Sequence, residues 1–183
     1  MSLKYILLGM LNEPASGYDL KDRFQNSVQH FWAAELAQIY PLLGKMDEMG
    51  WLNSQAVNSS HGPPRKLYAR TDTGLAALVA WLNEGPEFKP DRIPWLAQVF
   101  FLNEIPSSER SQFIRQLKAK FEIRLAALEQ IEHEWQHEDS NYPDQLADTE
   151  FYPQLTLQLG MSRYRATIQW CDECLQRISL REK

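Results

Sequence analysis

Residues 36–74 restrict the possible folds of this chain more than any other segment. Apolar residues recur near its start at Leu36, Ile39, Leu43 and Met46. This spacing of three, four and three predicts a helix with one buried face. Gly50 follows at a position where helices often end in a left-handed residue, and Trp51-Leu52 restart the chain in a new direction.

Two strand-like runs, 51–57 and 66–71, come after this helix. The tip between them contains Gly62-Pro63-Pro64, and proline cannot donate to a strand ladder, so we expect a hairpin with an irregular tip. Thr71 then opens a new helix. A helix, a β-hairpin with basic residues at its tip and a further helix make up the back half of a winged helix-turn-helix.

The first 30 residues agree with this fold. A helical stripe of apolar residues consists of Leu3, Ile6, Leu7, Met10 and Leu11 and ends at Asn12-Glu13-Pro14. Ser16 and Asp19 predict a capping box, and we expect Tyr18, Phe24 and Val28 to face inward. Domains of this type insert the third helix into the DNA major groove. A small helical domain with a hairpin and no DNA function would show the same pattern.

Two motifs resemble the PadR family of transcriptional regulators. One runs from Gln38-Ile39-Tyr40-Pro41 to Gly50-Trp51-Leu52, and the other from Gly62 to Gly74. From about Ile93 onward the chain is similar to the long-helix dimerisation region of the larger PadR-like proteins. The resemblance implies a mainly α protein with an N-terminal winged helix-turn-helix, a small β-hairpin and an all-helical C-terminal domain. It also implies a homodimeric repressor of transcription that binds double-stranded DNA at a two-fold operator and is released by an effector.

The chain departs from the family pattern at two positions. Gly44 stands where the family often has Lys or Arg, which would weaken phosphate contacts. Arg70 replaces a usual aliphatic residue and would place an extra cation near the wing.

Six side chains are predicted to contact DNA. They are Gln38, Tyr40 and Lys45 on the third helix and Arg65, Lys66 and Tyr68 on the wing. Glutamine can hydrogen-bond adenine through two bonds, whereas a tyrosine hydroxyl or a lysine usually meets a phosphate. The two cations at the wing tip should meet the backbone or enter a narrow minor groove. Core packing is the alternative for Tyr40, and a solvated surface for Gln38.

The distribution of charge does not strengthen the prediction of DNA binding. The net charge is −5, and residues 1–83 hold seven Lys/Arg and seven Asp/Glu. A strongly basic domain, the usual mark of nucleic-acid binding, is absent from the sequence. The competing hypothesis is an effector-binding or protein-interaction module on the same fold with weak or lost DNA binding.

Composition favours a cytoplasmic protein with two structural parts. No apolar run approaches the ~20 residues that span a bilayer, and two cysteines are too few for a disulfide framework. Residues 85–94 contain three prolines and a glycine and predict a hinge. We therefore expect a DNA-binding domain over 1–84 and a helical dimerisation and effector domain over 95–183.

The C-terminal part is predicted to contain two long helices. The first begins near Ser107, its expected cap, and continues for ~30 residues, roughly 45 Å. The second carries a heptad pattern, here called the C-terminal stripe: Leu157, Met161, Tyr164, Ile168, Cys171, Leu175 and Ile178. We expect this stripe to form the homodimer contact, because a two-fold operator needs two winged helices. An antiparallel helix pair within one chain is the alternative.

Several residues resemble other kinds of site. His133-Glu134-Trp135-Gln136-His137 matches a zinc-protease motif, but Trp135 continues the apolar face that Leu125, Leu128 and Ile131 form on the first long helix, and this helix ends directly afterwards. Cys171 and Cys174 lack a second cysteine pair and are interpreted as packing residues. We therefore predict no metal, no cofactor and no enzymatic activity.

Aromatic residues could form a cavity for a small aromatic or hydrophobic effector, with core packing as the alternative. They are Trp81, Trp95, Phe100, Phe101, Trp135, Tyr152 and Trp170.

Overall fold

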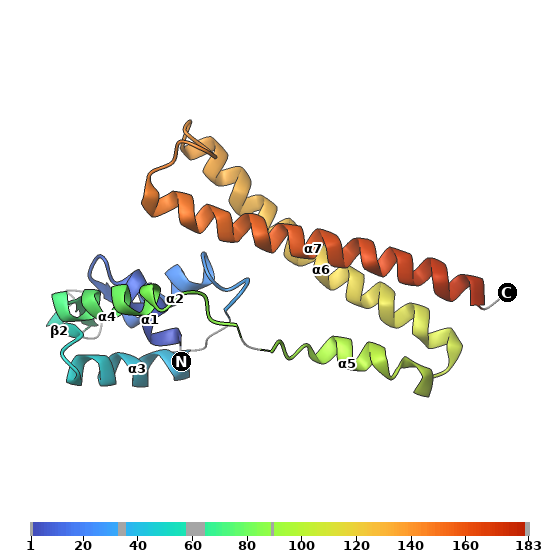
Figure 1. Cartoon of the computed structure of the whole chain (residues 1–183), viewed down its shortest axis with the longest axis horizontal. Coiled ribbons are helices and arrows are strands. Elements are labelled where there is room, and N and C mark those ends of the chain that lie inside the picture. Colours follow the sequence, from blue (N-terminus) through green and yellow to red (C-terminus); the bar gives the residue numbers. More distant parts are fainter. Residues whose placement is uncertain (1, 33–35, 58–64, 89, 182–183) are drawn as a thin grey trace. The chain divides into compact units, whose positions relative to one another are not determined.

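The computed structural model describes residues 2–32, 36–57, 65–88 and 90–181. The chain divides into two compact units, residues 1–89 and 90–183. Figure 1 colours the first unit from blue to green and the second from green to red.

The first unit is a winged helix, as the sequence predicts. Its elements are α1 (Leu3–Met10), β1 (Ala15–Ser16), α2 (Gly17–Gln25), α3 (Leu36–Glu48), β2 (Leu52–Val57), β3 (Arg65–Arg70) and α4 (Asp72–Asn83). The strands form an antiparallel sheet in the order β1-β3-β2. The strand β1 was not predicted, because two residues are too few to show an alternating pattern. The predicted Gly-Pro-Pro tip lies outside the described residues.

The core of this unit is made by the apolar faces of its helices. Leu7 and Leu8 of α1, Leu20 and Phe24 of α2, and Ile39, Leu43 and Met46 of α3 are all buried. The expectation that Tyr18 faces inward is wrong, since its side chain is 61% exposed. Gly17, Leu20 and Phe24 form the buried face of α2, and Tyr18 lies off that face.

Local hydrogen bonds fix the start of two helices. The Ser16 hydroxyl accepts from the Asp19 backbone N–H at 3.2 Å, and the Asp19 carboxylate accepts from the Ser16 N–H at 2.9 Å. These two bonds make the predicted capping box. Thr71 caps α4 by accepting from the Gly74 N–H at 3.1 Å, and its hydroxyl donates to the Gly50 carbonyl at 2.7 Å. Gly50 has φ +70°, the left-handed conformation expected of it.

The second unit is helical throughout its main elements. They are α5 (Pro94–Phe100), a single 3₁₀ turn (Leu102–Glu104), α6 (Ser107–Glu138) and α7 (Asp148–Arg181). The helices α6 and α7 run antiparallel along each other (Figure 1). Ser107 is the first residue of α6 rather than its cap, because Pro106 occupies the capping position and forms no side-chain bond there.

The C-terminal stripe packs within its own chain, which is the alternative named for it, and its part in a homodimer contact stays a prediction. Leu157, Met161 and Cys171 are buried on α6, against a row of residues that includes Phe121 and Leu128. The four other members, Tyr164, Ile168, Leu175 and Ile178, are half-buried in the same clusters. Ion pairs join the helices, Lys118 to Asp172 at 2.6 Å and Arg165 to Glu129 at 2.8 Å.

The stripe pattern correctly identifies the buried face of α7. It cannot identify the helix that covers this face, and a second long amphipathic helix in the same chain lies nearby in sequence.

No helix among the described residues combines the length and apolar character needed to cross a membrane.

Candidate nucleic-acid interface

The third helix separates its core residues from its predicted DNA contacts. Ile39 and Met46 point into the core, whereas Gln38, Tyr40 and Lys45 have exposed side chains. The separation follows from helical periodicity, because each exposed residue is one position away from a buried one. The helix therefore exposes Gln38 and Lys45 on one flank of its buried face and Tyr40 on the other flank.

Tyr40 is both exposed and packed. Tyr40 is 48% exposed, and one edge of its ring lies close to Gly17, the first residue of α2. A Cβ atom at position 17 would overlap the Tyr40 ring. Gly17 thus allows α2 and α3 to approach at this point and fixes where the Tyr40 hydroxyl lies.

The two adjacent cations of the wing point to opposite faces of the hairpin. Successive side chains of a strand alternate between faces, so Arg65 and Lys66 cannot be equivalent. Lys66 shares its face with Tyr68, which is buried in the core. Lys66 therefore faces the body of the unit, and Arg65 is exposed on the other side of the strand.

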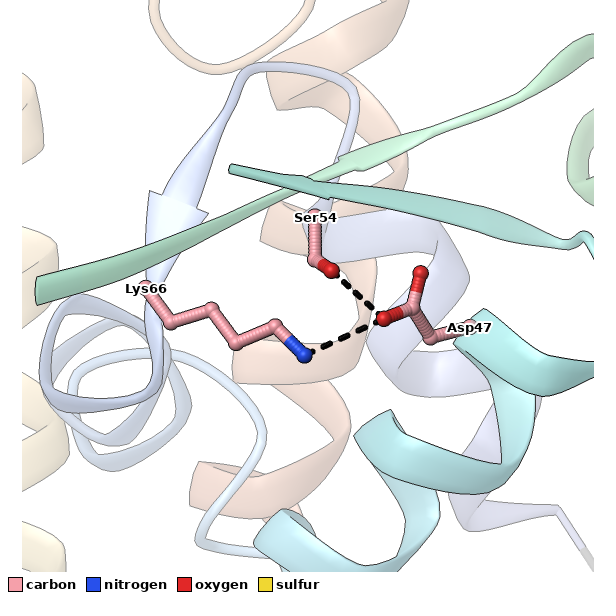
Figure 2. A network of polar contacts seen from close by, with 3 residues as sticks. All are labelled: Asp47, Ser54 and Lys66. Carbon is pink, nitrogen blue, oxygen red and sulfur yellow. Dashed lines mark hydrogen bonds and ion pairs between the residues drawn. The ribbon is translucent and has the colours of Figure 1, made fainter. Parts of the chain in front are cut away.

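Lys66 belongs to a polar network that joins the wing to the third helix. Figure 2 shows Asp47 of α3 accepting two hydrogen bonds on one carboxylate oxygen, from the Ser54 hydroxyl at 2.5 Å and the Lys66 Nζ at 3.1 Å. Ser54 lies on β2 and Lys66 on β3, so the carboxylate connects both strands of the wing to the end of α3. Lys66 Nζ also lies 5.2 Å from the centre of the Tyr68 ring.

The hydrogen bond from Ser54, followed by that from Lys66, holds the pKa of Asp47 below its usual range. The carboxylate is therefore charged at neutral pH. Neither Asp47 nor Ser54 was among the residues predicted from the sequence. Strand alternation provided a signal, because it turns Lys66 and Ser54 toward the helix.

Tyr68 is a core residue and not a DNA contact. Its side chain is 7% exposed and belongs to the apolar cluster of the first unit. It also pairs across the sheet with Ser54 and with Ala15. A side chain buried in this way has almost no surface to offer to a nucleic acid.

The two departures from the family pattern have different structural consequences. Arg70 is half-buried and donates to the Leu8 carbonyl at 3.0 Å, so it joins β3 to α1 and does not extend the wing's positive surface. Gly44 lies on α3 with open space around it, since a Cβ atom built there would meet no other atom within 4 Å. A longer side chain would therefore fit at position 44.

Neither of the other two motifs forms a chemical site. His133 and His137 are exposed near the end of α6, and His137 Nδ1 bonds the His133 carbonyl at 2.8 Å. The part of the chain that the structure describes contains no group of three or more residues suited to hold a metal ion. Burial raises the pKa of Cys171 to about 11, with a smaller contribution from Cys174, so this thiol is not a thiolate at neutral pH.

Within the second unit, some of the aromatic residues named for a cavity pack in the core and others are exposed. Trp95 packs on Phe121 and Trp170, while Phe100, Phe101 and Tyr152 are exposed. Trp81 instead lines a hollow of about 320 Å³ within the first unit. The other lining residues of this hollow are Lys4, Tyr5, Glu84, Gly85, Pro86 and Glu87.

Two family models match the chain. The transcriptional regulator PadR-like family matches residues 6–80, and the virulence activator alpha C-terminal family matches residues 92–179. Among characterised proteins, the negative transcriptional regulator PadR of Bacillus subtilis is 26% identical over 180 residues, which are 96% of this chain and 97% of that protein.

Solved structures share the complete fold. Bacillus subtilis PadR in complex with operator DNA has a TM-score of 0.81 at 24% identity, covering 97% of this chain and 99% of that one. The same protein in complex with p-coumaric acid has a TM-score of 0.76 at 25% identity, covering 97% and 95%. The family, like these relatives, consists of regulators and not enzymes. Residues 6–80 thus match the PadR-like family, nearly the whole chain aligns with Bacillus subtilis PadR, and the protein is a PadR-like transcriptional regulator.

Proposed function

We propose that this protein is a cytoplasmic repressor that binds a two-fold DNA operator as a homodimer and is released by a small aromatic effector. Residues 1–84 would bind DNA, residues 95–183 would form the dimer, and residues 85–94 would connect them. The observation that carries DNA binding is the exposure of Gln38, Tyr40 and Lys45 on the two flanks of the buried face of α3. A relative of known structure is bound to operator DNA, which supports the same role here.

A mobility-shift assay tests DNA binding directly. The protein's own promoter region is the operator candidate, and a duplex of scrambled sequence is the control. We expect a salt-sensitive complex that forms at lower protein concentration on the promoter than on the scrambled duplex. Equal affinity for both duplexes, or no complex at low salt, would refute the proposed operator binding.

The sign of regulation needs a separate experiment. The relative Bacillus subtilis PadR is a negative regulator, whereas the C-terminal family is named for a virulence activator. Expression of a reporter gene placed under the control of this promoter should rise when the gene for the protein is deleted. A fall in reporter expression would make the protein an activator.

Because α6 covers the buried members of the C-terminal stripe, a second copy needs a further exposed surface on α7. Tyr152, Leu155 and Leu159 recur on α7 at spacings of three and four and are 62%, 44% and 60% exposed. Together they form an apolar face of the helix that α6 leaves uncovered. We propose that the second copy of the chain packs on this face, because contiguous exposed apolar residues commonly mark a protein contact.

The effector is proposed to bind in the hollow beside Trp81. Tyr5 and Trp81 stack with ring centres 4.8 Å apart and offer a flat apolar surface, while the Lys4 ammonium lies 4.6 Å from the Tyr5 ring centre. A planar aromatic acid suits this combination, with its ring on the aromatic pair and its carboxylate near Lys4. A relative binds p-coumaric acid, which is the probe to use.

Titration with p-coumaric acid should change the tryptophan fluorescence of the protein and dissociate its complex with DNA. Both effects should be lost in Trp81→Leu, and both should persist in Trp135→Leu, which changes the same residue type in the other unit. Release of DNA that survives Trp81→Leu would move the effector site elsewhere.

The alternative is a regulator that kept the fold and lost DNA binding. The pairing of Lys66 with Asp47 supports it, because this contact offsets the charge of one of the few cations on the surface of the winged-helix unit. The mobility-shift assay separates the two hypotheses.

A further inference from the structure

The contact between Asp47 and Lys66 has a consequence for DNA affinity. In a winged helix, cations of the wing strengthen binding by replacing the counterions of phosphates. A lysine already paired with a carboxylate must either leave that partner or contribute less to the phosphate contact. The strand geometry adds to this effect, because Lys66 faces α3 and not the open side of the wing.

We propose that Asp47 is a positioning residue that holds Lys66 on the third helix and so limits the affinity of the wing for DNA. Its carboxylate occupies the place a phosphate oxygen would take at the lysine, 3.1 Å from Nζ. Arg65, on the opposite face of β3, has only a weaker electrostatic attraction to the Asp19 carboxylate and is then the wing cation available to DNA. This inference rests on the proposed DNA binding and identifies the residues that set its strength.

Neighbouring contacts also restrict the orientation of the Asp47 carboxylate. The Ser54 hydroxyl binds the same carboxylate oxygen at 2.5 Å and orients it toward the lysine (Figure 2). The side chain of Asp47 is 25% exposed and that of Lys66 is 50% exposed, so water screens the pair only in part. The strands β2 and β3 are in register beside it, with Ser54 opposite Tyr68 and Ala56 opposite Lys66. Three elements therefore determine one contact.

The test measures binding to a random-sequence duplex over a range of salt concentrations. Asp47→Asn removes the charge and keeps an oxygen for the Ser54 hydroxyl. It should tighten binding roughly fivefold near physiological salt and steepen the plot of log K against log salt by about 0.9, which corresponds to one additional phosphate contact. Glu48→Gln is the matched control, because it makes the same charge change one residue away on an exposed side chain.

According to the proposal, the gain in DNA affinity of Asp47→Asn depends on Lys66. In the double variant Asp47→Asn with Lys66→Ala, the added affinity and slope should disappear. Lys66→Ala alone should leave the slope close to that of the wild type, whereas Arg65→Ala should reduce it by about 0.9. Ser54→Ala, which loses a hydrogen bond but frees no charge, should gain less affinity than Asp47→Asn.

Three results would overturn the proposal: an effect of Asp47→Asn no larger than that of Glu48→Gln, a gain that persists without Lys66, or a slope reduced equally by Lys66→Ala and Arg65→Ala. Thermal melts of each variant identify any that fail to fold.

A measurement without DNA separates this inference from the proposed function. Carbon NMR titration of the Asp47 carboxyl should give a pKa below the usual range in the wild type, rising toward it in Lys66→Ala. An unchanged titration would show that the contact is absent, whatever the DNA assay gives. A clear rise, combined with a wild type that binds no duplex, would refute the DNA-binding function and show that the contact serves only to brace the wing.

Discussion

The winged-helix unit and the helical pair differ in how their apolar faces are covered. In the first unit, short helices are separated by turns with specific chemistry, such as the capping box at Ser16 and the left-handed Gly50. These turns fix the directions of the helices and thereby determine which apolar faces pack against each other. In the second unit, two helices of 32 and 34 residues present long apolar faces with few such markers. A periodic face on a long helix can be covered by a helix of the same chain or of another copy, and the period is the same in both cases.

The largest expected effect tests which chain covers the C-terminal stripe. Met161→Glu places a carboxylate at a position that is 2% exposed on α7, so it should destabilise the helical pair by several kcal/mol. Leu159→Glu makes the same kind of change two residues away, on the exposed face. It should leave the melting temperature nearly unchanged and convert dimer to monomer. Circular dichroism melts and sedimentation at micromolar concentration provide both readouts.

A Met161→Glu protein that folds but is monomeric would contradict this assignment of the buried and dimer-forming faces of α7. It would show that the stripe contacts the second copy after all, and that α6 covers it only loosely.

The next effect concerns the close contact on which the winged-helix unit depends. A Cβ atom at Gly74 would collide with the Trp51 backbone carbonyl, which cannot move without disturbing the Thr71 N–H bonded to it at 3.1 Å. Gly74→Ala should therefore lower the free energy of unfolding by about 1–3 kcal/mol. Gly9→Ala, in the open middle of α1, should instead raise it by roughly 0.5–1 kcal/mol. Urea unfolding monitored by the fluorescence of Trp51 and Trp81 measures both, and equal stabilities would show that α4 can shift.

Local and long-range contacts differ in how well they could be predicted from the sequence alone. The capping box, Gly50 and the buried side of α3 follow from local rules, because each involves residues a few positions apart. The Asp47 network joins residues 7 and 19 positions apart through a sheet register, and no pattern within one segment encodes it. Tyr68 was misassigned for the same reason, since its burial depends on strands and helices packing over it.

A third prediction asks whether the exposed face of α3 contributes specificity. Gln38→Ala should cost about 1–3 kcal/mol on the operator and little on random DNA, provided that Gln38 hydrogen-bonds a base. Gln112→Ala on α6 is the control, because it makes the same change on an exposed helical residue of the other unit. Competition binding with operator and scrambled duplexes measures the ratio. Equal losses on both duplexes would make Gln38 a backbone contact.

The smallest effect concerns Gly44, where the family often has a cation and this chain has an open site on α3. The surrounding space admits a side chain without collision, and glycine within a helix is about 0.8–1.0 kcal/mol less favourable than alanine. Gly44→Ala should therefore raise the melting temperature and leave the salt dependence of DNA binding unchanged. Gly44→Lys should stabilise the helix to a similar degree and also steepen the salt plot by about 0.9, because it adds one phosphate contact. If Gly44→Lys stabilises the protein but binds DNA like Gly44→Ala, then position 44 faces away from the duplex. The DNA-facing side of α3 would then be the flank that carries Gln38 and Lys45, because Gly44 lies next to Tyr40 at a spacing of four residues.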